Sequence, residues 1–355
     1  MKILIIKFRN IGDVLLSTPL IENLFKNYNN CKIDLAINKE CESMVSFNPF
    51  INNIYSYNRS FIKGKSLYSK LKYEFNYFKE LNKNKYDLIL NLTEGDRGGL
   101  TTLFLSGKVK MGYESRKGIL KYIKNFDAYA SDFLKIHTID KDLQFIGLLK
   151  KDIKNKNVSL YWTKNDEEIV ANILKSNNIN KFVQIHPVSR WMFKCWENDR
   201  MAKIIDYLQM KKDIKVIITA SPEKKERDRV DEILNLCDSK PLNLTAKLTL
   251  KQLAYLSSRA DLFFGIDSAP MHMAAAVNTP IFALMGGSES IHWGPWSNEQ
   301  LINNYTTNDG IQNMGKNTII SNYDHEIFYE NKIKKCKGMV KIEVNEVLKV
   351  INEKI

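Results

Sequence analysis

Residues 2–28, KILIIKFRNIGDVLLSTPLIENLFKNY, hold the pattern that decides the fold class. Lys2–Lys7 is an apolar run typical of a strand, and Phe8–Gly12 is a polar loop that ends in glycine. From Asp13 to Tyr28, apolar residues recur at helical spacing. The stretch is therefore predicted to be a strand–loop–helix unit, the element from which parallel sheets covered by helices are built.

The strand–helix alternation continues through both halves of the chain. Further strands are predicted over Lys32–Ile37, Tyr86–Leu92, Lys181–Ile185, Ile214–Thr219, Asp261–Gly265 and Pro280–Met285. Helices are predicted over Asn198–Met210, Pro222–Cys237, Thr249–Arg259, Ala269–Val277 and Lys341–Ile355. This pattern predicts an α/β fold with two doubly wound domains, residues 1–160 and 161–335, on either side of a cleft, and a closing helix within residues 336–355.

Length and composition are those of an ordinary soluble globular protein. The 355 residues suit two compact cores, and 44% of them are hydrophobic and 26% charged. No apolar run approaches the roughly 20 residues that span a bilayer, and the N-terminal run lacks the features of a secretory signal, so we expect a cytoplasmic protein. Five dispersed cysteines without CxxC spacing argue against a disulfide framework and a structural zinc site, and the five histidines show no ligand spacing either. Nothing in the sequence calls for a dedicated metal, and we expect no cofactor.

The chain is basic, with 53 Lys and Arg against 40 Asp and Glu and a net charge of +13. Such an excess points to an anionic partner: a nucleic acid, a nucleotide, or the phosphates of a lipid or membrane surface. Lys- and Asn-rich usage in an AT-rich genome would also produce part of the excess. Because the sequence contains no known nucleic-acid-binding module, we expect no nucleic-acid partner.

The segment between Arg59 and Lys85 has a distinct composition, with eight basic residues, two acidic ones and six aromatics. We expect a basic, partly amphipathic helix here, which suits a phosphate-rich or membrane-surface partner. The alternative is a solvated helix that buries one aromatic stripe in its own domain.

Gly12 and Asp13 follow the first predicted strand. A glycine lets the backbone approach a ligand, and an Asp at a helix start is commonly only a cap. However, open α/β domains bind their ligands at the carboxyl edge of the sheet, where this Asp is expected to lie. A carboxylate there can take a proton from a sugar hydroxyl.

The loop IHPVSRWMFKCW, Ile185–Trp196, follows a strand of the second half and concentrates polar groups. Lys and Arg after a strand suit a diphosphate, which gains charge when it departs as a leaving group. Trp191 and Trp196, each taken alone, are expected in the core.

The segment GIDSAPMHMAAA, Gly265–Ala276, places Asp267 and Ser268 between a strand and a helix. The N–H groups and the dipole of that helix start favour an anion, and Pro270 suits the first turn. His272 is expected to face the ligand. The chain has no GxGxxG and no P-loop motif, so these two nucleotide-binding signatures are excluded.

Three stretches together resemble the ADP-heptose:lipopolysaccharide heptosyltransferases of glycosyltransferase family 9. They are KILIIKFRNIGDVLLSTPLIENL from Lys2, IHPVSRWMFKCWENDRMAKII from Ile185 and LTLKQLAYLSSRADLFFGIDSAPMHMAAAVNTPIFALMGGS from Leu248. The variant FKCW at Phe193–Trp196 is most similar to the heptosyltransferase III branch. The resemblance implies a GT-B fold with an N-terminal acceptor domain and a C-terminal nucleotide-sugar domain. It also implies inverting, metal-independent transfer of heptose from ADP-L-glycero-β-D-manno-heptose to an inner-core heptose of lipopolysaccharide.

The resemblance further implies roles for individual residues. Asp13 matches the family's proposed base, and Lys194 matches the residue that binds the diphosphate. The other implied donor-binding residues are Ser189, Arg190, Glu223, Leu248, Asp267, Ser268, Ala269, Pro270 and His272. The implied acceptor is phosphorylated lipid A–inner core at the cytoplasmic face of the inner membrane, with contacts from Gly12, Arg59, Lys63, Lys65, Lys70 and Lys72.

The chain departs from the family pattern in one motif. Where the family has Asp-Thr-Gly-Leu-Ser-His, this sequence has DSAPMH from Asp267 to His272, which keeps a hydroxyl but removes a backbone donor at Pro270. The alternatives are a GT-B enzyme that uses another nucleotide sugar, a sugar-nucleotide epimerase of the same fold, and a non-catalytic lipid-binding scaffold. A scaffold would have no need of both a base and a diphosphate-binding Lys.

Overall fold

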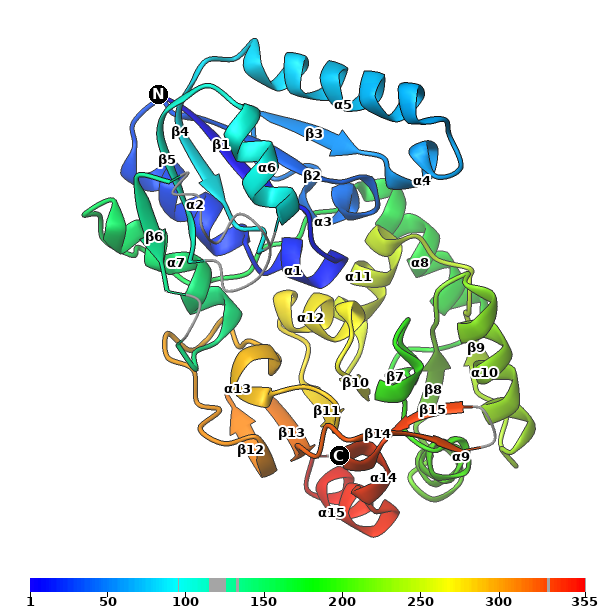
Figure 1. Ribbon diagram of the computed structural model, residues 1–355. Helices are drawn as coiled ribbons and strands as arrows, with labels where there is room; N and C mark the ends of the chain where they lie inside the picture. Colours follow the sequence, from blue (N-terminus) through cyan, green and yellow to red (C-terminus); the bar gives the residue numbers. More distant parts are fainter. Residues whose placement is uncertain (95, 115–125, 132–133, 331–332, 355) are drawn as a thin grey trace. The chain divides into compact units, whose positions relative to one another are not determined.

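The computed structural model describes residues 1–94, 96–114, 126–131, 134–330 and 333–354. The chain divides into two compact units, Met1–Tyr161 and Trp162–Ile355 (Figure 1). Each unit is built on a largely parallel sheet with helices between its strands. The predicted α/β class is therefore confirmed.

In the first unit, the described residues form a six-stranded parallel sheet in the order β3-β2-β1-β4-β5-β6. Its strands are β1 (Lys2–Lys7), β2 (Lys32–Asn38), β3 (Asn53–Tyr57), β4 (Tyr86–Asn91), β5 (Gly107–Tyr113) and β6 (Ala128–Ala130). The helices are α1 (Ile11–Leu15), α2 (Thr18–Asn27), α3 (Glu42–Val45), α4 (Arg59–Ile62), α5 (Leu67–Asn82), α6 (Asp96–Phe104) and α7 (Thr138–Leu148). Strand β1 lies between two others and buries five of its six residues, which explains its continuous apolar sequence.

The helix predicted over Asp13–Tyr28 is two helices, α1 and α2, with a break at Leu16 and Ser17. The hydroxyls of Ser17 and Thr18 donate to backbone carbonyls of α1 at 2.7 and 2.9 Å. Pro19 has no N–H with which to continue the hydrogen-bond ladder. The single-helix prediction is therefore wrong, because side-chain hydroxyls and a proline end the first helix.

The segment predicted as one helix over Arg59–Lys85 is also divided, into α4 and α5. Between them Gly64 has a left-handed φ of +79°, a conformation that glycine adopts without steric cost. Tyr73 and Tyr77 of α5 pack edge-on against Tyr57, with ring centroids 5.3 and 5.4 Å away. The segment thus does bury one aromatic stripe in its own unit, although other large apolar side chains of α4 and α5 are exposed.

In the second unit, the described residues form a seven-stranded sheet in the order β12-β13-β11-β10-β7-β8-β9, in which β12 alone pairs antiparallel. Its strands are β7 (Phe182–His186), β8 (Lys215–Ile218), β9 (Leu242–Asn243), β10 (Leu262–Ile266), β11 (Ile281–Met285), β12 (Asp309–Met314) and β13 (Asn317–Asn322). A separate antiparallel pair joins β14 (Ile327–Glu330) to β15 (Ile333–Cys336). The helices are α8 (Lys164–Ser176), α9 (Asn198–Asp206), α10 (Lys224–Asn235), α11 (Leu250–Arg259), α12 (Ala269–Ala276), α13 (Ser290–Trp293), α14 (Lys337–Lys341) and α15 (Val344–Lys354).

Both parallel sheets extend in two directions from their first strand. Strand β1 lies between β2 and β4, and strand β7 lies between β8 and β10. In open α/β sheets, ligands bind outside the carboxyl ends of the strands at this point, where the strand order reverses. Functional side chains are therefore expected in the loops after β1, β4, β7 and β10.

The C-terminal helices belong to the core of the second unit. Val347, Val350 and Ile351 of α15 are buried in the same apolar cluster as Trp196. The helix predicted over Lys341–Ile355 begins at Val344, and Ile355 lies outside the described residues.

Gly338 in α14 crosses the loop after β11 at backbone contact distance. A Cβ atom at this position would overlap the carbonyl oxygens of Asn322 and Gly286. We expect Gly338→Ala to destabilise the protein by about 1–3 kcal/mol, measured as a lower midpoint of thermal unfolding. Gly147→Ala in α7 is the matched control, because a Cβ there meets nothing within 4 Å. It should raise stability by roughly 0.5–1 kcal/mol, and equal midpoints for the two variants would contradict the close crossing.

Candidate functional site

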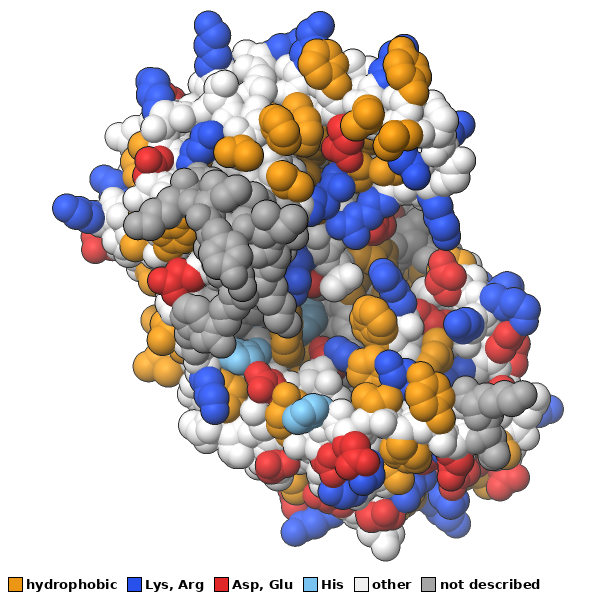
Figure 2. Space-filling model, viewed as in Figure 1, with side chains coloured by type: hydrophobic (Ala, Val, Ile, Leu, Met, Phe, Trp, Pro, Cys, Tyr) orange, Lys and Arg blue, Asp and Glu red, His pale blue; other side chains and the backbone are white. Residues whose placement is uncertain are grey.

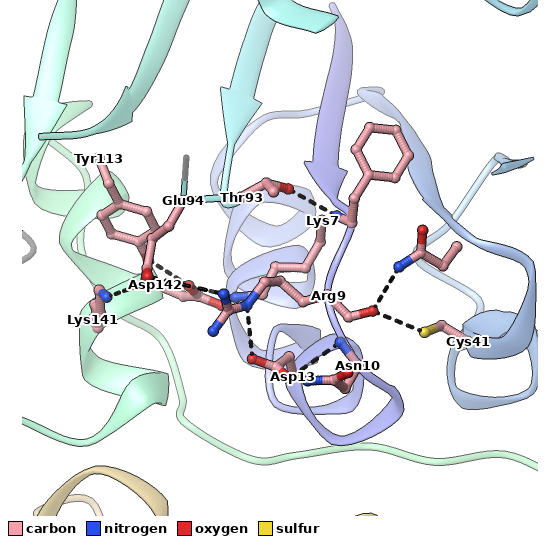
Figure 3. A network of polar contacts seen from close by, with 12 residues as sticks. Lys7, Arg9, Asn10, Asp13, Cys41, Thr93, Glu94, Tyr113, Lys141 and Asp142 are labelled. Atoms are coloured by element: carbon pink, nitrogen blue, oxygen red, sulfur yellow. Dashed lines mark hydrogen bonds and ion pairs between the residues drawn. The ribbon is translucent and has the colours of Figure 1, made fainter. Parts of the chain in front are cut away.

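Asp13 lies just beyond the carboxyl end of β1, in the first turn of α1 (Figure 3). Its Oδ2 accepts hydrogen bonds from the backbone N–H and the side-chain amide of Asn10, both at 3.2 Å. The carboxylate thus caps α1, although Asp13 is the third residue of the helix and not its start. Asp13 is 8% exposed, which leaves a small part of it open to a ligand.

Arg9 lies between two carboxylates, those of Asp13 and Glu94. Its Nε is 3.3 Å from Asp13 Oδ1, and its Nη1 is 3.9 Å from Glu94 Oε2. Glu94 also pairs with Lys141, whose Nζ is 2.6 Å from Oε1. Burial raises the pKa of Glu94, but Lys141 and Arg9 outweigh burial and lower the pKa below its ordinary value. Contacts on both sides therefore hold Arg9, which in turn orients the Asp13 carboxylate.

A buried ion pair behind Arg9 joins β1 to α7 (Figure 3). Lys7 Nζ contacts both carboxylate oxygens of Asp142, at 2.8 and 3.0 Å, and the Tyr113 hydroxyl donates to the same carboxylate at 2.5 Å. All three residues are buried. None of them, nor Arg9 or Glu94, was among the predicted site residues. The available signal was a Lys at the end of an otherwise apolar strand.

In the second unit, Lys194 and Asp267 form an ion pair where the strand order reverses. Lys194 ends a single 3₁₀ turn after β7, and Asp267 directly follows β10. Lys194 Nζ is 2.5 Å from Asp267 Oδ2, and the Ser288 hydroxyl donates to the same oxygen. His272 Nε2 lies 3.7 Å from Asp267 Oδ1. Burial would raise the pKa of Asp267, but Lys194 and His272 hold it well below its usual range, so the carboxylate is ionised.

The N-terminus of α12 directly follows Asp267 and lies in this cluster. Ser268 is the N-cap, and Ala269 and Pro270 form the start of the first turn, as predicted. Within the described part of the chain, Ser268 Oγ and His272 Nδ1 are buried without a hydrogen-bond partner. Buried polar atoms in native proteins are nearly always paired, so two such atoms beside a helix N-terminus indicate a polar or anionic ligand.

The rest of the loop after β7 has a buried part and an exposed part. Ser189 is buried, and its Oγ accepts from the N–H of Trp191 at 3.2 Å. Arg190 is exposed, with its guanidinium 5.5 Å from the centre of the Trp191 ring. Trp191 is itself 49% exposed, so its expected place in the core is wrong, because its loop lies at the open edge of the sheet. Trp196 is buried as expected, and its Nε1 donates to the carbonyl of Ile342 at 3.0 Å.

Glu223 and Leu248 follow β8 and β9, so they lie along the same edge of the sheet as Lys194. Glu223 is exposed at the N-cap of α10, and Leu248 is half-buried. The structure therefore gathers Lys194, Asp267 and His272 into one cluster and places the other donor candidates at the carboxyl edge around it.

The acceptor candidates lie in α1, α4, α5 and the link between the last two. Gly12 is buried in α1, and Arg59 Nη2 donates to the carbonyl of Phe8 at 3.4 Å, just beyond β1. The other four acceptor candidates, Lys63, Lys65, Lys70 and Lys72, are exposed. Among the described residues, no helix combines the length and the apolar character that a bilayer crossing requires, and no three His, Cys, Asp or Glu side chains group as metal ligands would.

The two units share one plan, a parallel sheet that extends both ways from its first strand, with polar residues where the order reverses. One unit presents a carboxylate there, and the other presents a Lys–Asp pair beside a helix N-terminus that suits a diphosphate. Two such domains in one chain are characteristic of the GT-B fold, the fold of many nucleotide-sugar glycosyltransferases.

Comparison with known proteins identifies the family. Residues 75–323 match the model of glycosyltransferase family 9 (heptosyltransferase). Lipopolysaccharide heptosyltransferase 3 of Escherichia coli K12 is 34% identical to this chain over 295 residues, which are 81% of this chain and 83% of that protein. The chain belongs to glycosyltransferase family 9.

Two solved structures have the same fold. The family 9 glycosyl transferase of Veillonella parvula DSM 2008 superposes with a TM-score of 0.80 at 20% identity, covering 99% of this chain and 96% of that one. The E. coli heptosyltransferase WaaC with ADP superposes with a TM-score of 0.74 at 13% identity, covering all of both chains. At these identities the likeness concerns the fold, and it confirms the predicted GT-B class.

Proposed function

We propose that this glycosyltransferase moves heptose from ADP-L-glycero-β-D-manno-heptose to an inner-core heptose of lipopolysaccharide, with inversion, in the manner of a heptosyltransferase III. The observation behind the proposal is the cluster at the start of α12. There the Lys194–Asp267 pair and two unpartnered polar atoms suit a diphosphate. The name of the E. coli relative supplies the acceptor class.

On the donor side, Lys194 and the N-terminus of α12 bind the diphosphate in this scheme. Their positive charge stabilises the negative charge that develops on ADP as its bond to the sugar breaks. Asp267 holds Lys194 in place before the donor arrives. The other donor-binding residues proposed along this edge are Ser189, Arg190, Glu223, Leu248, Ser268, Ala269, Pro270 and His272.

On the acceptor side, Asp13 acts as the base. One carboxylate oxygen takes the proton of the attacking hydroxyl while the hydroxyl oxygen bonds to the anomeric carbon and the bond from that carbon to ADP breaks. Arg9 keeps the carboxylate oriented through its contact at 3.3 Å. The positive charge for the leaving group comes from Lys194 and α12, so the proposed transfer uses no metal and no cofactor.

The proposed acceptor is phosphorylated lipid A–inner core at the cytoplasmic face of the inner membrane. Gly12 lies beside the base, and a set of cations suits the phosphates of this acceptor. The set consists of Arg59, Lys63, Lys65, Lys70 and Lys72. The chain then works as a cytoplasmic protein peripheral to that membrane, without a nucleic-acid partner.

Calorimetric titration with ADP, UDP, GDP and CDP tests the donor. We expect ADP to bind most tightly, by about 1.4 kcal/mol or more, which is tenfold in Kd. Preference for another nucleotide would keep the GT-B fold and assign a different donor. No binding of any of the four would favour the lipid-binding scaffold.

A further inference from the structure

The outer side of α4, α5 and α6 exposes a group of large apolar side chains. We call this group the outer apolar face. Its members are between 43% and 75% exposed, and they are Phe61, Leu67, Tyr68, Leu71, Phe75, Leu100, Leu103 and Phe104. Figure 2 shows hydrophobic side chains gathered over this part of the first unit, with Lys and Arg side chains around them. Apolar patches of this kind on soluble proteins mark interaction sites.

The outer apolar face of α5 is distinct from the side that packs on the sheet. Leu67, Leu71 and Phe75 recur every four residues, so they form one stripe along the helix. Tyr73 and Tyr77 lie on a different side and pack against the core of the unit. Because Leu67, Leu71 and Phe75 are exposed, this second apolar stripe has no role in holding α5 to the sheet. The outer side of a solvated helix normally carries polar residues instead.

Helix α6 contacts the C-terminal part of α5 through its last residue, Phe104. The Phe104 ring stacks on Phe78 with ring centroids 5.5 Å apart. The side-chain amide of Asn82 donates to the carbonyl of Phe104 at 2.9 Å. Leu100 and Leu103 of α6 are also exposed and add apolar surface to this part of the unit.

Positive charge borders the outer apolar face. The exposed lysines at this border are Lys63, Lys65, Lys72, Lys79 and Lys83. Lys72 and Lys79 of α5 and Lys83 at its C-cap follow one another at intervals of seven and four residues, which places them beside the apolar stripe. Of the two acidic residues in this segment, Glu74 pairs with Arg97 and Glu80 pairs with Lys83. The border as a whole is therefore cationic.

We propose that the outer apolar face inserts into the surface of an anionic bilayer, so that the protein contacts the membrane directly and not only through its acceptor. An apolar stripe bordered by lysines is the pattern of helices that lie in a membrane interface. The apolar side chains enter the boundary of headgroups and acyl chains, while the ammonium groups attract anionic headgroups. The inference rests on the proposed function in one respect, since a lipid-anchored acceptor lies at that surface. The same positive border disfavours self-pairing of this face in a second copy of the chain.

Cosedimentation of the full chain with vesicles, without donor or acceptor, tests the contact. Wild type should bind vesicles of phosphatidylethanolamine and phosphatidylglycerol, and bind phosphatidylcholine vesicles much less. Leu71→Ser/Phe75→Ser should lower the partition coefficient by about tenfold or more, because two side chains that are 61% and 66% exposed lose their burial in lipid. The matched control is Leu301→Ser/Ile302→Ser in the second unit, at 63% and 72% exposure, which should bind like wild type.

The cationic border has its own test. Lys79→Glu/Lys83→Glu should weaken binding to the anionic vesicles, and added salt should weaken wild-type binding. Lys175→Glu/Lys181→Glu makes the same change of charge at exposed lysines of the second unit and should have little effect. An equal loss in both pairs would mean that net charge alone drives binding, and the proposed face would be rejected.

Turnover of a delipidated core oligosaccharide in solution separates this proposal from the proposed function. Leu71→Ser/Phe75→Ser should turn over that acceptor at the wild-type rate. Vesicle binding without turnover by wild type would reject heptose transfer and leave the membrane contact standing. Turnover without vesicle binding would overturn the membrane contact. The membrane contact would also be overturned if wild type does not bind vesicles and light scattering shows it to be a dimer that Leu71→Ser/Phe75→Ser converts to a monomer. The outer apolar face would then join two copies of the chain.

Discussion

Replacing Asp13 by Asn should lower kcat for heptose transfer by about 10²–10⁴-fold, the usual contribution of a positioned base. The Kd for ADP should stay within about twofold of wild type, because the base acts on the acceptor. Asn is the informative substitution, since its amide oxygen can still accept from the N–H of Asn10, as Asp13 Oδ2 does at 3.2 Å. The amide cannot take a proton. A stopped assay with ADP-heptose and a core acceptor measures kcat, and calorimetry measures Kd.

Asp166→Asn is the matched control for this experiment. Asp166 is the third residue of α8, and its carboxylate accepts from the N–H of Thr163 at 2.9 Å, so it caps its helix as Asp13 does. The two substitutions should therefore cost similar stability, on the order of 1 kcal/mol or less. Only Asp13→Asn should lower the rate. A folded Asp13→Asn enzyme with wild-type turnover would falsify the assignment of the base.

Replacing Lys194 by Met should lower both stability and catalysis. The variant leaves the ionised Asp267 buried without the ammonium that now lies 2.5 Å away. Loss of one partner of such a pair costs about 3–5 kcal/mol, which lowers the unfolding midpoint by roughly 10 °C. The same change removes a positive charge from the proposed diphosphate site, so kcat/KM should fall by about 10²–10³-fold and ADP should bind more weakly.

The double variant Lys194→Met/Asp267→Asn separates the two effects. Without a buried unpaired charge, most of the unfolding midpoint should return, while the rate should stay low. Lys335→Met is the matched control, because Lys335 pairs with Glu197 at 2.9 Å and its side chain is as exposed as that of Lys194, at 20%. That variant should leave ADP affinity unchanged. If the rate recovers together with the midpoint in the double variant, Lys194 is only a structural partner of Asp267.

The central parallel strands of both sheets could be predicted from sequence, and several strands at or near the sheet edges could not. The predicted range Lys2–Lys7 is the observed β1, because a central parallel strand is a continuous apolar run. In contrast, β3 has the sequence NIYSY and β5 has GKVKMGY, and neither was predicted. Both are partly exposed, and neither has the apolar run of a central strand.

The candidate site shows the same division between local and tertiary information. Lys194 and Asp267 stand in segments that follow strands, and His272 lies in the first turn of the helix after Asp267. The sequence could therefore place them at one edge, and they do form a cluster. The contacts of Arg9 with Glu94 and of Ser288 with Asp267 join segments that are distant along the chain. They exist because β4 lies beside β1 and β11 beside β10, which no local pattern encodes.

The crossing of Gly338 over Gly286 also bears on the order in which the chain folds during its synthesis. The loop that begins at Gly286 carries Ser288, which completes the hydrogen bonds of Asp267, and this loop packs against the backbone of α14. Chains are made from the N-terminus, and domains generally fold as units as they emerge from the ribosome. The first unit can therefore fold while part of the second unit is still untranslated. The proposed nucleotide-binding edge reaches its final form only after α14 has emerged, so a product cut short before Gly338 would keep the first unit without a finished edge of this kind.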